Sequence, residues 1–573
     1  MLDSAADLPH DAAMASQHSL RSPARLSGFL LVGLCACSQV VPAEADDEPA
    51  LPRAASPLLD DAQIVAVDLP ATLSCAATYR ATVTVRNSGS ATWSRAAGYK
   101  LGAVDDSDPF YGPDTRVWLP DGVSVAAGAT YTFSFDLIAP AAAGRYVTDW
   151  RMVHEGVRWF GATTRREVSV RCVPAVVDAT TLERKLLMGY QGWFACAGDG
   201  SPVGGWVHWF RASPACASLT VDLWPDVSEL PAAERCATGM KRADGSPAPL
   251  YSAWNADTVA RHFLWQKEQG LDGVLLQRFT SELSDPRFFA LRNQVARNVR
   301  AGAETHGRAF ALMYDISGHP AATLVDDLKR DWVYVVDTLG LIDSPRYLHH
   351  GGKPVLGLWG LGVRDRPGDP AQAQALIDFF KNHPDPRYRA TLIGGVPQRW
   401  RTLDGDSKTD AAWAGIYRSF DIISPWAVGA YSDDAGADRF KTANVAPDLA
   451  AARAAHAGYM PVIFPGFSWH NLLGGPANQI PRRGGRFFWR QAYNVMSAGS
   501  SMIFVAMFDE VDEGTAMMKL APTPAALPAG CALVPLNIDG ENLPSDFYLR
   551  VAGAATRMLH GETALTATLP ITP

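Results

Sequence analysis

The 573-residue sequence lacks the patterns that mark several large classes of protein. It has no Cys-x-x-Cys and no His-Glu-x-x-His spacing, so we expect neither a metal site nor a cofactor. No Gly-x-Gly-x-x-Gly follows an early strand, as a dinucleotide site would require. Charged residues make up only 19%, and the formal net charge of −8 offers no basic face to nucleic acid. We therefore expect no nucleic-acid partner.

A hydrophobic run long enough to span a bilayer is also lacking, because the only membrane-directed segment, residues 26–36, is too short. Two arginines precede it, as a basic region precedes the apolar part of an export signal. Residues 34–37 resemble a bacterial lipobox, in which Cys37 becomes the lipidated first residue, and residues 43–45 form a competing cleavage site. We expect an export signal at 1–37 and a periplasmic or cell-surface lipoprotein, or a secreted protein, with membrane contact only through the lipid.

Cysteine is scarce, and its distribution favours disulfide bonds. Of the eight cysteines, two lie in the expected signal and six remain, an even number in an exported chain. Six cysteines allow fifteen connectivities. Cys75 and Cys172 bracket one expected domain, and we predict that they pair. The other four, for which the pairing stays open, are Cys196, Cys216, Cys236 and Cys531.

The chain is long enough for several domains, and 47% hydrophobic residues indicate that it is globular. Residues 38–60 are rich in Ala, Pro, Asp and Glu without periodicity, as expected of a linker. Residues 61–174 alternate between apolar and polar positions in short runs separated by turn signals, which predicts an all-β sandwich. The clearest of these runs are 82–86, 131–137 and 168–171.

Four tryptophans lie within the predicted sandwich: Trp93, Trp118, Trp150 and Trp159. With the stretches 85–93, 139–146 and 150–161, they give this region an order and spacing that resemble the immunoglobulin-like four-tryptophan domain of the next-to-BRCA1 type. The resemblance implies a binding or spacing module rather than a catalytic one. The alternative interpretation is that the four rings are simply core.

From residue 185 to 573 near-continuous apolar segments alternate with amphipathic ones. Apolar strands covered on both faces and separated by helices predict a parallel (β/α)₈ TIM barrel, with an open doubly wound sheet as the alternative. The expected helices are 255–269, 287–305, 371–382, 446–457 and 486–497. The expected strands are 186–194, 272–279, 309–316, 353–360, 390–397, 419–428, 459–468 and 501–510. Short alternating runs at 547–551 and 564–568 predict a small C-terminal β appendage.

The segment 508–516 places four carboxylates at the end of the last expected strand. In a parallel barrel this end of the strand opens onto the active-site face, so Glu510 and Glu513 are the predicted catalytic pair for cleavage of a glycosidic bond. The alternative is that these acids cap the following helix.

Other polar and aromatic residues are expected at the same face, because they also lie at the ends of strands. Sugar sites need amides and arginines for hydroxyl groups and flat rings for the apolar faces of pyranoses. For single members the alternatives are an N-cap at Asp315, a structural hydrogen bond at His470 and core packing at Trp359 and Trp426. The predicted substrate-binding residues are Tyr190, Gln191, Trp193, Gln277, Arg278, Tyr314, Asp315, Trp359, Pro425, Trp426, Trp469, His470 and Asn471.

Four stretches of the C-terminal region, 189–194, 221–226, 262–279 and 508–515, resemble bacterial proteins related to glycoside hydrolase families 71 and 99. Family 99 carries Glu-Trp-His-Glu-Gly at its catalytic strand end, and residues 510–514 match both glutamates and the glycine. Family 71 has Asp-x-x-Glu instead. The Trp-His pair is replaced by Val-Asp here, which places mannoside specificity in doubt.

The resemblance implies a (β/α)₈ enzyme that acts on α-linked polysaccharides or glycans. Glu513 would be the acid/base on the glycosidic oxygen, and Glu510 would take the proton of the sugar 2-hydroxyl in a substrate-assisted, retaining reaction. Burial and neighbouring negative charges would keep Glu513 protonated near neutral pH. An inverting, family 71-like α-glucanase and a non-catalytic polysaccharide-binding surface lipoprotein are the alternatives.

Overall fold

The computed structural model describes residues 58–112, 114–142, 144–171 and 176–573. These residues form two compact units, 58–171 and 176–573. Cys37 and Cys172, named above for lipidation and for a disulfide, lie outside the described residues. Their roles stay predictions. Within the described part of the chain, no helix is long and apolar enough to cross a membrane.

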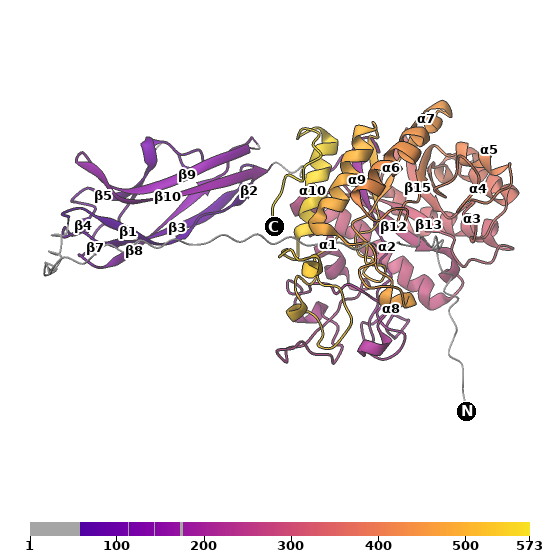
Figure 1. Ribbon diagram of the computed structural model, residues 1–573, viewed down its shortest axis with the longest axis horizontal. Helices are drawn as coiled ribbons and strands as arrows, with labels where there is room; N and C mark the ends of the chain where they lie inside the picture. Colours follow the sequence, from indigo (N-terminus) through magenta and orange to yellow (C-terminus); the bar gives the residue numbers. More distant parts are fainter. Residues whose placement is uncertain (1–57, 113, 143, 172–175) are drawn as a thin grey trace, which may run out of the picture. The chain divides into compact units, whose positions relative to one another are not determined.

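The N-terminal unit is a β-sandwich, as its alternating sequence predicts (Figure 1). Along β8, every second side chain is buried, and the same alternation runs through much of β3. One sheet has the order β1 (Ala62–Asp68), β3 (Thr78–Asn87), β8 (Thr130–Ile138). The other has the order β2 (Thr72–Ser74), β10 (Arg158–Arg171), β9 (Gly144–His154), β5 (Tyr99–Ala103), β6 (Arg116–Trp118), and β4 (Trp93–Ser94) pairs with β7 (Ser124–Val125).

The four tryptophans of this unit divide into two kinds. Trp93 and Trp150 are fully buried in its core. Trp118 and Trp159 are half-buried, and cations cover them: the Lys100 ammonium lies 3.3 Å from the Trp118 ring centroid and the Arg116 guanidinium 4.9 Å from that of Trp159. The core interpretation therefore holds for two of the rings, while the other two belong to a cation-covered surface.

The C-terminal unit is built on one curled sheet of parallel strands, with helices around the strands (Figure 1). The short strand β14 (His349–His350) pairs antiparallel with β15. Along the sheet the order is β18 (Gly458–Tyr459), β17 (Ile422–Pro425), β16 (Thr391–Val396), β15 (Lys353–Trp359), β13 (Ala309–Asp315), β12 (Gly273–Phe279), β11 (Lys185–Tyr190), β20 (Met502–Val505), β19 (Val462–Ile463).

The first and last long strands of this unit are neighbours, because β11 pairs in parallel with β20. Every residue of β11, β16, β17 and β20 is buried, as expected of strands covered on both faces. The expected strand 459–468 is interrupted: β18 pairs with β17, and β19 pairs with β20. Both ends of the sheet therefore belong to one short segment, 458–463.

The five expected helices are present, with ends set by ordinary capping. Asn255 accepts bonds from the first turn of α1, and Gly270 ends that helix in the left-handed conformation. Asp369 and Gln372 form a capping box at α4. The helices are α1 (Ala256–Gln269), α2 (Pro286–His306), α3 (Leu324–Tyr334), α4 (Pro370–Asn382), α5 (Trp413–Arg418), α6 (Asp434–Phe440), α7 (Ala446–Ala454), α8 (His470–Leu473), α9 (Arg486–Ser497) and α10 (Phe547–His560).

The predicted C-terminal β appendage is wrong. Residues 547–551 open the helix α10 (Phe547–His560), and residues 564–568 form no strand. Most of α10 is buried, and Gly553 lies so close to α1 that a methyl group there would sit 2.1 Å from the Gln269 carbonyl oxygen. Small residues permit this close helix packing, which is why the short apolar run belongs to a helix and not to a strand.

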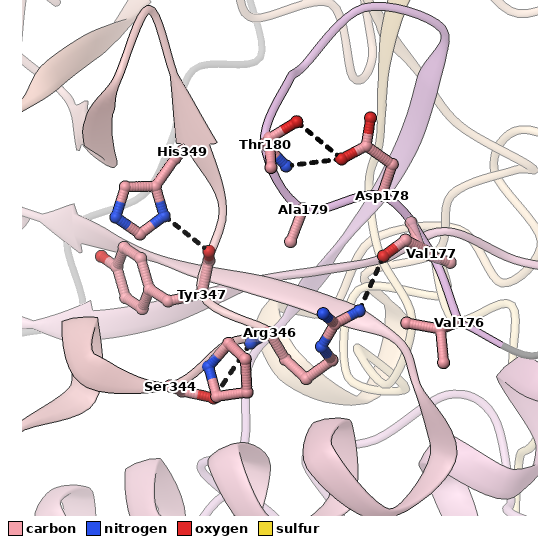
Figure 2. A pocket seen from close by; sticks show the side chains of 10 residues that line it. Val176, Val177, Asp178, Ala179, Thr180, Ser344, Arg346, Tyr347 and His349 are labelled. Carbon is pink, nitrogen blue, oxygen red and sulfur yellow. Dashed lines mark hydrogen bonds between the residues drawn. The ribbon is translucent and has the colours of Figure 1, made fainter.

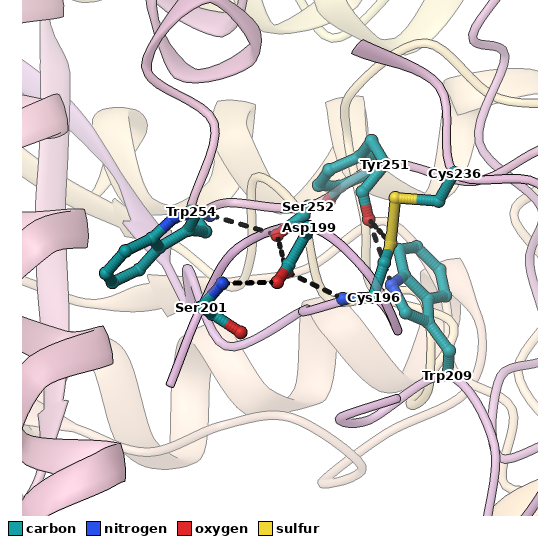
Figure 3. The surroundings of a disulfide bond; sticks show 8 residues. All are labelled: Cys196, Asp199, Ser201, Trp209, Cys236, Tyr251, Ser252 and Trp254. Atoms are coloured by element: carbon teal, nitrogen blue, oxygen red, sulfur yellow. Dashed lines mark hydrogen bonds between the residues drawn. A yellow bond between two sulfur atoms is a disulfide. The ribbon is translucent and has the colours of Figure 1, made fainter. Parts of the chain in front are cut away.

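Two disulfide bonds join loops of the C-terminal unit, Cys196–Cys236 and Cys216–Cys531. Around the first bond, the Trp209 indole donates to the Tyr251 carbonyl at 3.1 Å (Figure 3). The carboxylate of Asp199 accepts from the backbone of Cys196 and from the hydroxyl of Ser252, at 2.9 and 2.6 Å (Figure 3). The loop that follows β11 is thus fixed by covalent and polar contacts.

Candidate active site

The acidic segment predicted from the sequence forms a buried loop directly after β20. Asp509, Glu510 and Asp512 are each at most 4% exposed, and Glu513 is half-buried. The loop crosses to the end of β11, because the backbone nitrogens of Gln191 and Gly192 donate to the Asp509 carboxylate at 2.7 and 2.9 Å. These bonds fix the acidic loop to the neighbouring strand end.

Glu510 accepts hydrogen bonds from two side chains, whereas Glu513 lies near an indole and a guanidinium. The amide of Gln191 donates to one Glu510 carboxylate oxygen, and the Thr515 hydroxyl donates to the other at 2.5 Å. Both bonds favour the ionised form of Glu510. The Trp469 indole and the Arg366 guanidinium lie near Glu513 and also favour its ionised form, but burial and the charge of Asp512 outweigh them.

Burial raises the pKa of every carboxyl group in the loop. It raises the pKa of Asp509 to about 7 and that of Asp512 to about 8. Burial, reinforced by the charge of Asp512, raises the pKa of Glu513 to about 8. Burial and the charges of Glu513 and Asp512 raise the pKa of Glu510 well above its usual range. The loop therefore holds protonated carboxyl groups at neutral pH, as general acid catalysis requires.

Arg482 stabilises the acidic loop through hydrogen bonds to its backbone. This buried guanidinium donates to the carbonyl oxygens of Gly514 and Ala516 at 2.8 and 2.6 Å, and burial lowers its pKa to about 10. The backbone nitrogen of Ser468 donates to the Glu513 carbonyl at 2.9 Å. Gly514 has φ +69° and lies against Ser468, so the chain turns sharply where the second glutamate ends.

Half of the predicted binding residues gather at the ends of the strands near this loop. The Trp193 ring stacks on His208 with centroids 3.9 Å apart, and Trp359 meets Trp426 edge to face at 5.4 Å. These two tryptophans, with Trp193 and Trp469, are half-buried. The Asp315 carboxyl is close enough to raise the pKa of Glu513 by its charge, although burial is the main cause.

Three predicted binding residues face the surrounding helices instead. Arg278 forms a buried ion pair with Asp331 of α3 at 2.6 Å, and the Tyr314 hydroxyl donates to the same carboxylate. The Tyr190 hydroxyl lies 2.9 Å from His262 of α1. Adjacent strand residues point to opposite faces, so Gln277, beside Arg278, lies on the opposite, inner face, against Met313. Alternation therefore places Arg278, Tyr314 and Tyr190 in the packing layer.

His470 and Asn471 hold a loop in place. Their backbone nitrogens both donate to the buried Asp222 carboxylate at 2.7 Å, and the Asn471 amide donates to the carbonyl oxygens of Val221 and Ala532. The imidazole of His470 lies 2.9 Å from the Gly475 carbonyl. These contacts agree with the structural alternative for His470. Pro425 is the buried last residue of β17 and positions Trp426.

The structure adds three residues that the sequence analysis did not single out: Thr515, His208 and Arg366. Thr515 belongs to the same acidic run, so its position beside Glu510 was open to prediction. His208 lies in the long connection after β11 and its Nδ1 is 3.4 Å from Asp512. Arg366 lies between β15 and α4. Neither of these connections has a periodic pattern that would have identified its residue.

A cavity of about 420 Å³ lies away from the acidic loop. Its lining comes from residues 176–180 and 344–349, before the start of β15, where the Arg346 guanidinium donates to the Val177 carbonyl at 2.8 Å (Figure 2). Active sites on parallel sheets lie at the carboxyl ends of the strands, and this cavity lies at the amino end of β15. It is therefore separate from the candidate site.

The comparisons with known proteins divide along the two units. The family model described as the Ig-like domain from next to BRCA1 gene matches residues 70–170, so the N-terminal unit contains an Ig-like domain. No curated protein matches the chain. Among solved structures the chain is similar to a GH99 endo-alpha-mannosidase from Bacteroides thetaiotaomicron, with 14% identity, a TM-score of 0.49, and coverage of 66% of this chain and 99% of that one.

A second structure of that mannosidase, in complex with Bis-Tris-propane, gives 14% identity and a TM-score of 0.48, with 67% of this chain and 99% of the other covered. A glycoside hydrolase-like protein gives 15% identity and a TM-score of 0.39, with 55% of this chain and 89% of the other covered. These likenesses concern the general fold. The function has to be argued from the site.

Proposed function

We propose that the C-terminal unit is a glycoside hydrolase that cleaves α-linked polysaccharide or glycan. The observation that carries the proposal is the pair of buried Glu510 and half-buried Glu513 after β20, with tryptophans at the surrounding strand ends. Two carboxyl groups, one protonated and one ionised, are the machinery of glycosidic-bond cleavage. Flat rings beside them supply the stacking surfaces that sugar faces need.

The hydrogen bonds support different roles for the two glutamates. Burial raises the pKa of Glu510 as well, but the bonds from Gln191 and Thr515 favour its ionised form, so we assign Glu510 as the base. Glu513 is then the carboxyl group that keeps the shared proton and is the acid. This division agrees with the resemblance of residues 510–514 to family 99, in which the first glutamate acts on the 2-hydroxyl.

The proposed reaction has two steps. Glu513 protonates the glycosidic oxygen while Glu510 takes the 2-hydroxyl proton, and O2 attacks the anomeric carbon as the bond to the leaving group breaks. Water then opens the resulting 1,2-anhydro sugar: Glu513 takes a proton from the water, and Glu510 returns its proton to O2. The configuration at the anomeric carbon is retained after two inversions.

We also propose that the curled sheet closes into a (β/α)₈ barrel. Backbone bonds of the segment 458–463 support closure, since Met460 donates to Ile423 of β17 at 2.9 Å and Phe504 of β20 donates to Pro461 at 3.0 Å. A crystal structure with an unpaired sheet edge at this segment would contradict closure.

Substitution of Glu513 by Gln tests the function. Release of reducing sugar from α-glucans, α-mannans and arabinose- or xylose-containing glycans should fall about 10²–10⁴-fold, because Gln cannot donate the proton. Aryl glycosides with activated leaving groups should suffer less, whereas Glu510→Gln should be slow on every substrate.

The exposed Glu167→Gln change in the other unit is the control and should leave rates unchanged. Three results would change the proposal. Wild-type rates in a folded Glu513→Gln protein would refute the assignment. Binding without hydrolysis by the wild type would favour the polysaccharide-binding alternative, and NMR detection of an inverted first product would favour the family 71-like one.

We also propose that the protein is exported and anchored through a lipid on Cys37. The two disulfide bonds of the C-terminal unit support export, because such bonds persist in oxidising compartments. Mass spectrometry of the mature N-terminus should find lipidated Cys37. An unmodified chain that begins at Asp46 would contradict the anchor.

A further inference from the structure

Arg366 is a buried cation without a hydrogen-bonding partner for its guanidinium. It is 7% exposed, and across the described ranges its guanidinium makes no hydrogen bond or ion pair, with Nε fully buried and unpartnered. Other buried arginines of this unit differ. Arg278 bonds to Asp331 and Asn293, and Arg482 bonds to two backbone carbonyls. Native proteins rarely leave such donors unsatisfied, so this guanidinium is available to a polar ligand.

The guanidinium of Arg366 faces the candidate active site. Its central carbon lies 5.5 Å from the Trp359 ring centroid, and Trp359 packs edge to face on Trp426. Burial raises the pKa of both Asp315 and Glu513, and the charge of Arg366 opposes this rise at each. Arg366 therefore lies beside Trp359 and near enough to Asp315 and Glu513 for its charge to act on both.

Unpartnered buried atoms gather around the same loop. In the described part of the chain these include the indole nitrogens of two tryptophans near the acidic residues, one amide oxygen and one carboxylate oxygen. They are Trp193 Nε1, Trp359 Nε1, Gln191 Oε1 and Asp512 Oδ1, together with Arg366 Nε. Donors outnumber acceptors in this group, so the ligand that completes it must offer several acceptor oxygens.

We propose that Arg366 and Trp359 form a sugar-binding subsite beside Glu513, in which their N–H groups bind hydroxyl or ring oxygens of an uncharged sugar. This inference rests on the proposed function and specifies the substrate class of the same site. An uncharged sugar fits better than an anionic one, because the burial that raises the pKa of Asp315 and of the carboxyl groups of the loop also penalises any further negative charge. Arg366 is then a substrate-binding residue.

Glycan binding to the inactive Glu513→Gln full-length protein tests the subsite. Calorimetric titrations would use α-mannan and α-glucan oligosaccharides as probes. Adding Arg366→Met should weaken the tightest of these interactions about 10- to 100-fold, the effect of losing a charge-assisted hydrogen bond. Adding Arg364→Met, an exposed arginine of the same connection, should not change it. Equal affinity of a folded Arg366→Met protein overturns the subsite.

Two conservative variants keep the test decisive if Arg366→Met does not fold. Arg366→Lys keeps the charge but not the fork of donors, and Trp359→Phe keeps a ring but removes the N–H, so each should bind more weakly than the parent. Affinity unchanged in both contradicts the subsite. Tighter binding of uronic acid oligosaccharides than of neutral ones overturns the uncharged class. If no probe binds to the parent, the proposed function itself fails, and the subsite with it.

A pH profile separates substrate binding from a purely structural role. In the active protein, loss of the Arg366 charge removes an influence that lowers the pKa of Glu513. The basic limb of the activity profile should therefore move to higher pH in Arg366→Met, together with a higher KM. An unshifted limb with an unchanged KM would overturn the assignment.

Discussion

At the scale of single residues, the acidic loop works against the stability of the unit that contains it. Of four neighbouring carboxyl groups, three are buried and Glu513 is half-buried, and each is stabilised in its neutral form. Hydrogen bonds offset part of this penalty at Asp509 and Glu510, but Asp512 keeps one oxygen without a partner. Strain of this kind at one point of a fold is expected of a functional site.

The pH dependence of stability should report this penalty. Burial raises the pKa of Asp512 to about 8 in the folded protein, against about 3.9 for an unfolded aspartate. The favourable contribution of the neutral group is complete below about pH 4 and is lost as the pH rises to about 8. Asp512→Asn should therefore unfold roughly 2–4 °C higher than wild type at pH 8.5, and the gap should shrink towards pH 4.5.

Calorimetry or circular dichroism at three pH values measures this gap. Asp326→Asn, at an exposed aspartate of α3, is the matched control and should show none. The His208 imidazole, 3.4 Å from Asp512, offsets the buried charge only where it is itself protonated. A constant difference between Asp512→Asn and wild type across the range would show that Asp512 is ionised throughout.

At the scale of secondary-structure elements, the turn at Gly514 determines where Glu513 lies. A methyl group there would sit 2.7 Å from the Ser468 backbone nitrogen, which donates to the Glu513 carbonyl. Gly514→Ala combines this clash with a positive φ, so we expect a stability loss of about 1–3 kcal/mol and a lower kcat. Gly530→Ala is the control, because Gly530 has φ +78° but open space around it.

Urea unfolding and steady-state kinetics on the two glycine variants check this expectation. Equal losses of stability would show that only backbone conformation matters at Gly514. A normal kcat in Gly514→Ala would show that the turn does not position Glu513.

The Cys196–Cys236 disulfide should stabilise the loop region after β11. It closes a loop of 40 residues, for which chain entropy alone gives about 4 kcal/mol. The double change Cys196→Ala/Cys236→Ala should lower the urea midpoint of the C-terminal unit, and reducing agent should then have a smaller further effect than on the wild type. An unchanged midpoint would mean that the contacts of Asp199 and Trp209 hold the loop without the bond.

The elements predicted from the sequence show which sequence patterns are sufficient to locate the candidate site. A strand end near Glu510 and Glu513 was predictable, because a buried apolar run has to stop where polar residues begin, although β20 ends at Val505 and the expected strand at residue 510. The face of the sheet on which a strand residue lies was not predictable, since a shift of one position exchanges the inner and outer faces. Arg278 was thus assigned to the site, although its neighbour Gln277 is the one that faces inward.

Two further failures of prediction from the sequence have physical causes. The strand predicted at 547–551 is part of α10, because close packing of Gly553 on α1 outweighs the local preference of a short aromatic and β-branched run. Arg366 was not identified, because the evidence for its role is the lack of a hydrogen-bonding partner for its guanidinium. Absence of a partner is a property of three-dimensional packing and leaves no pattern in the sequence.

At the scale of the whole molecule, the two units should be separable, because the structure divides the described chain into two compact bodies, each with its own core. A protein that lacks residues 38–173 should keep the unfolding temperature of the C-terminal unit and most of its activity on a small soluble substrate. Scanning calorimetry and kinetics measure both. Loss of folding in this truncated protein would show that the sandwich is an integral part of the enzyme.

The Cys216–Cys531 bond joins two loops that are 315 residues apart in the chain. A protease that cuts once in any surface loop between them therefore produces two fragments that stay covalently linked. The cut ends remain at high local concentration, and the nicked sheet can close again without a second molecule having to be found. On an electrophoresis gel the damage would be visible only after reduction, so a population of such molecules can carry hidden breaks and still appear intact.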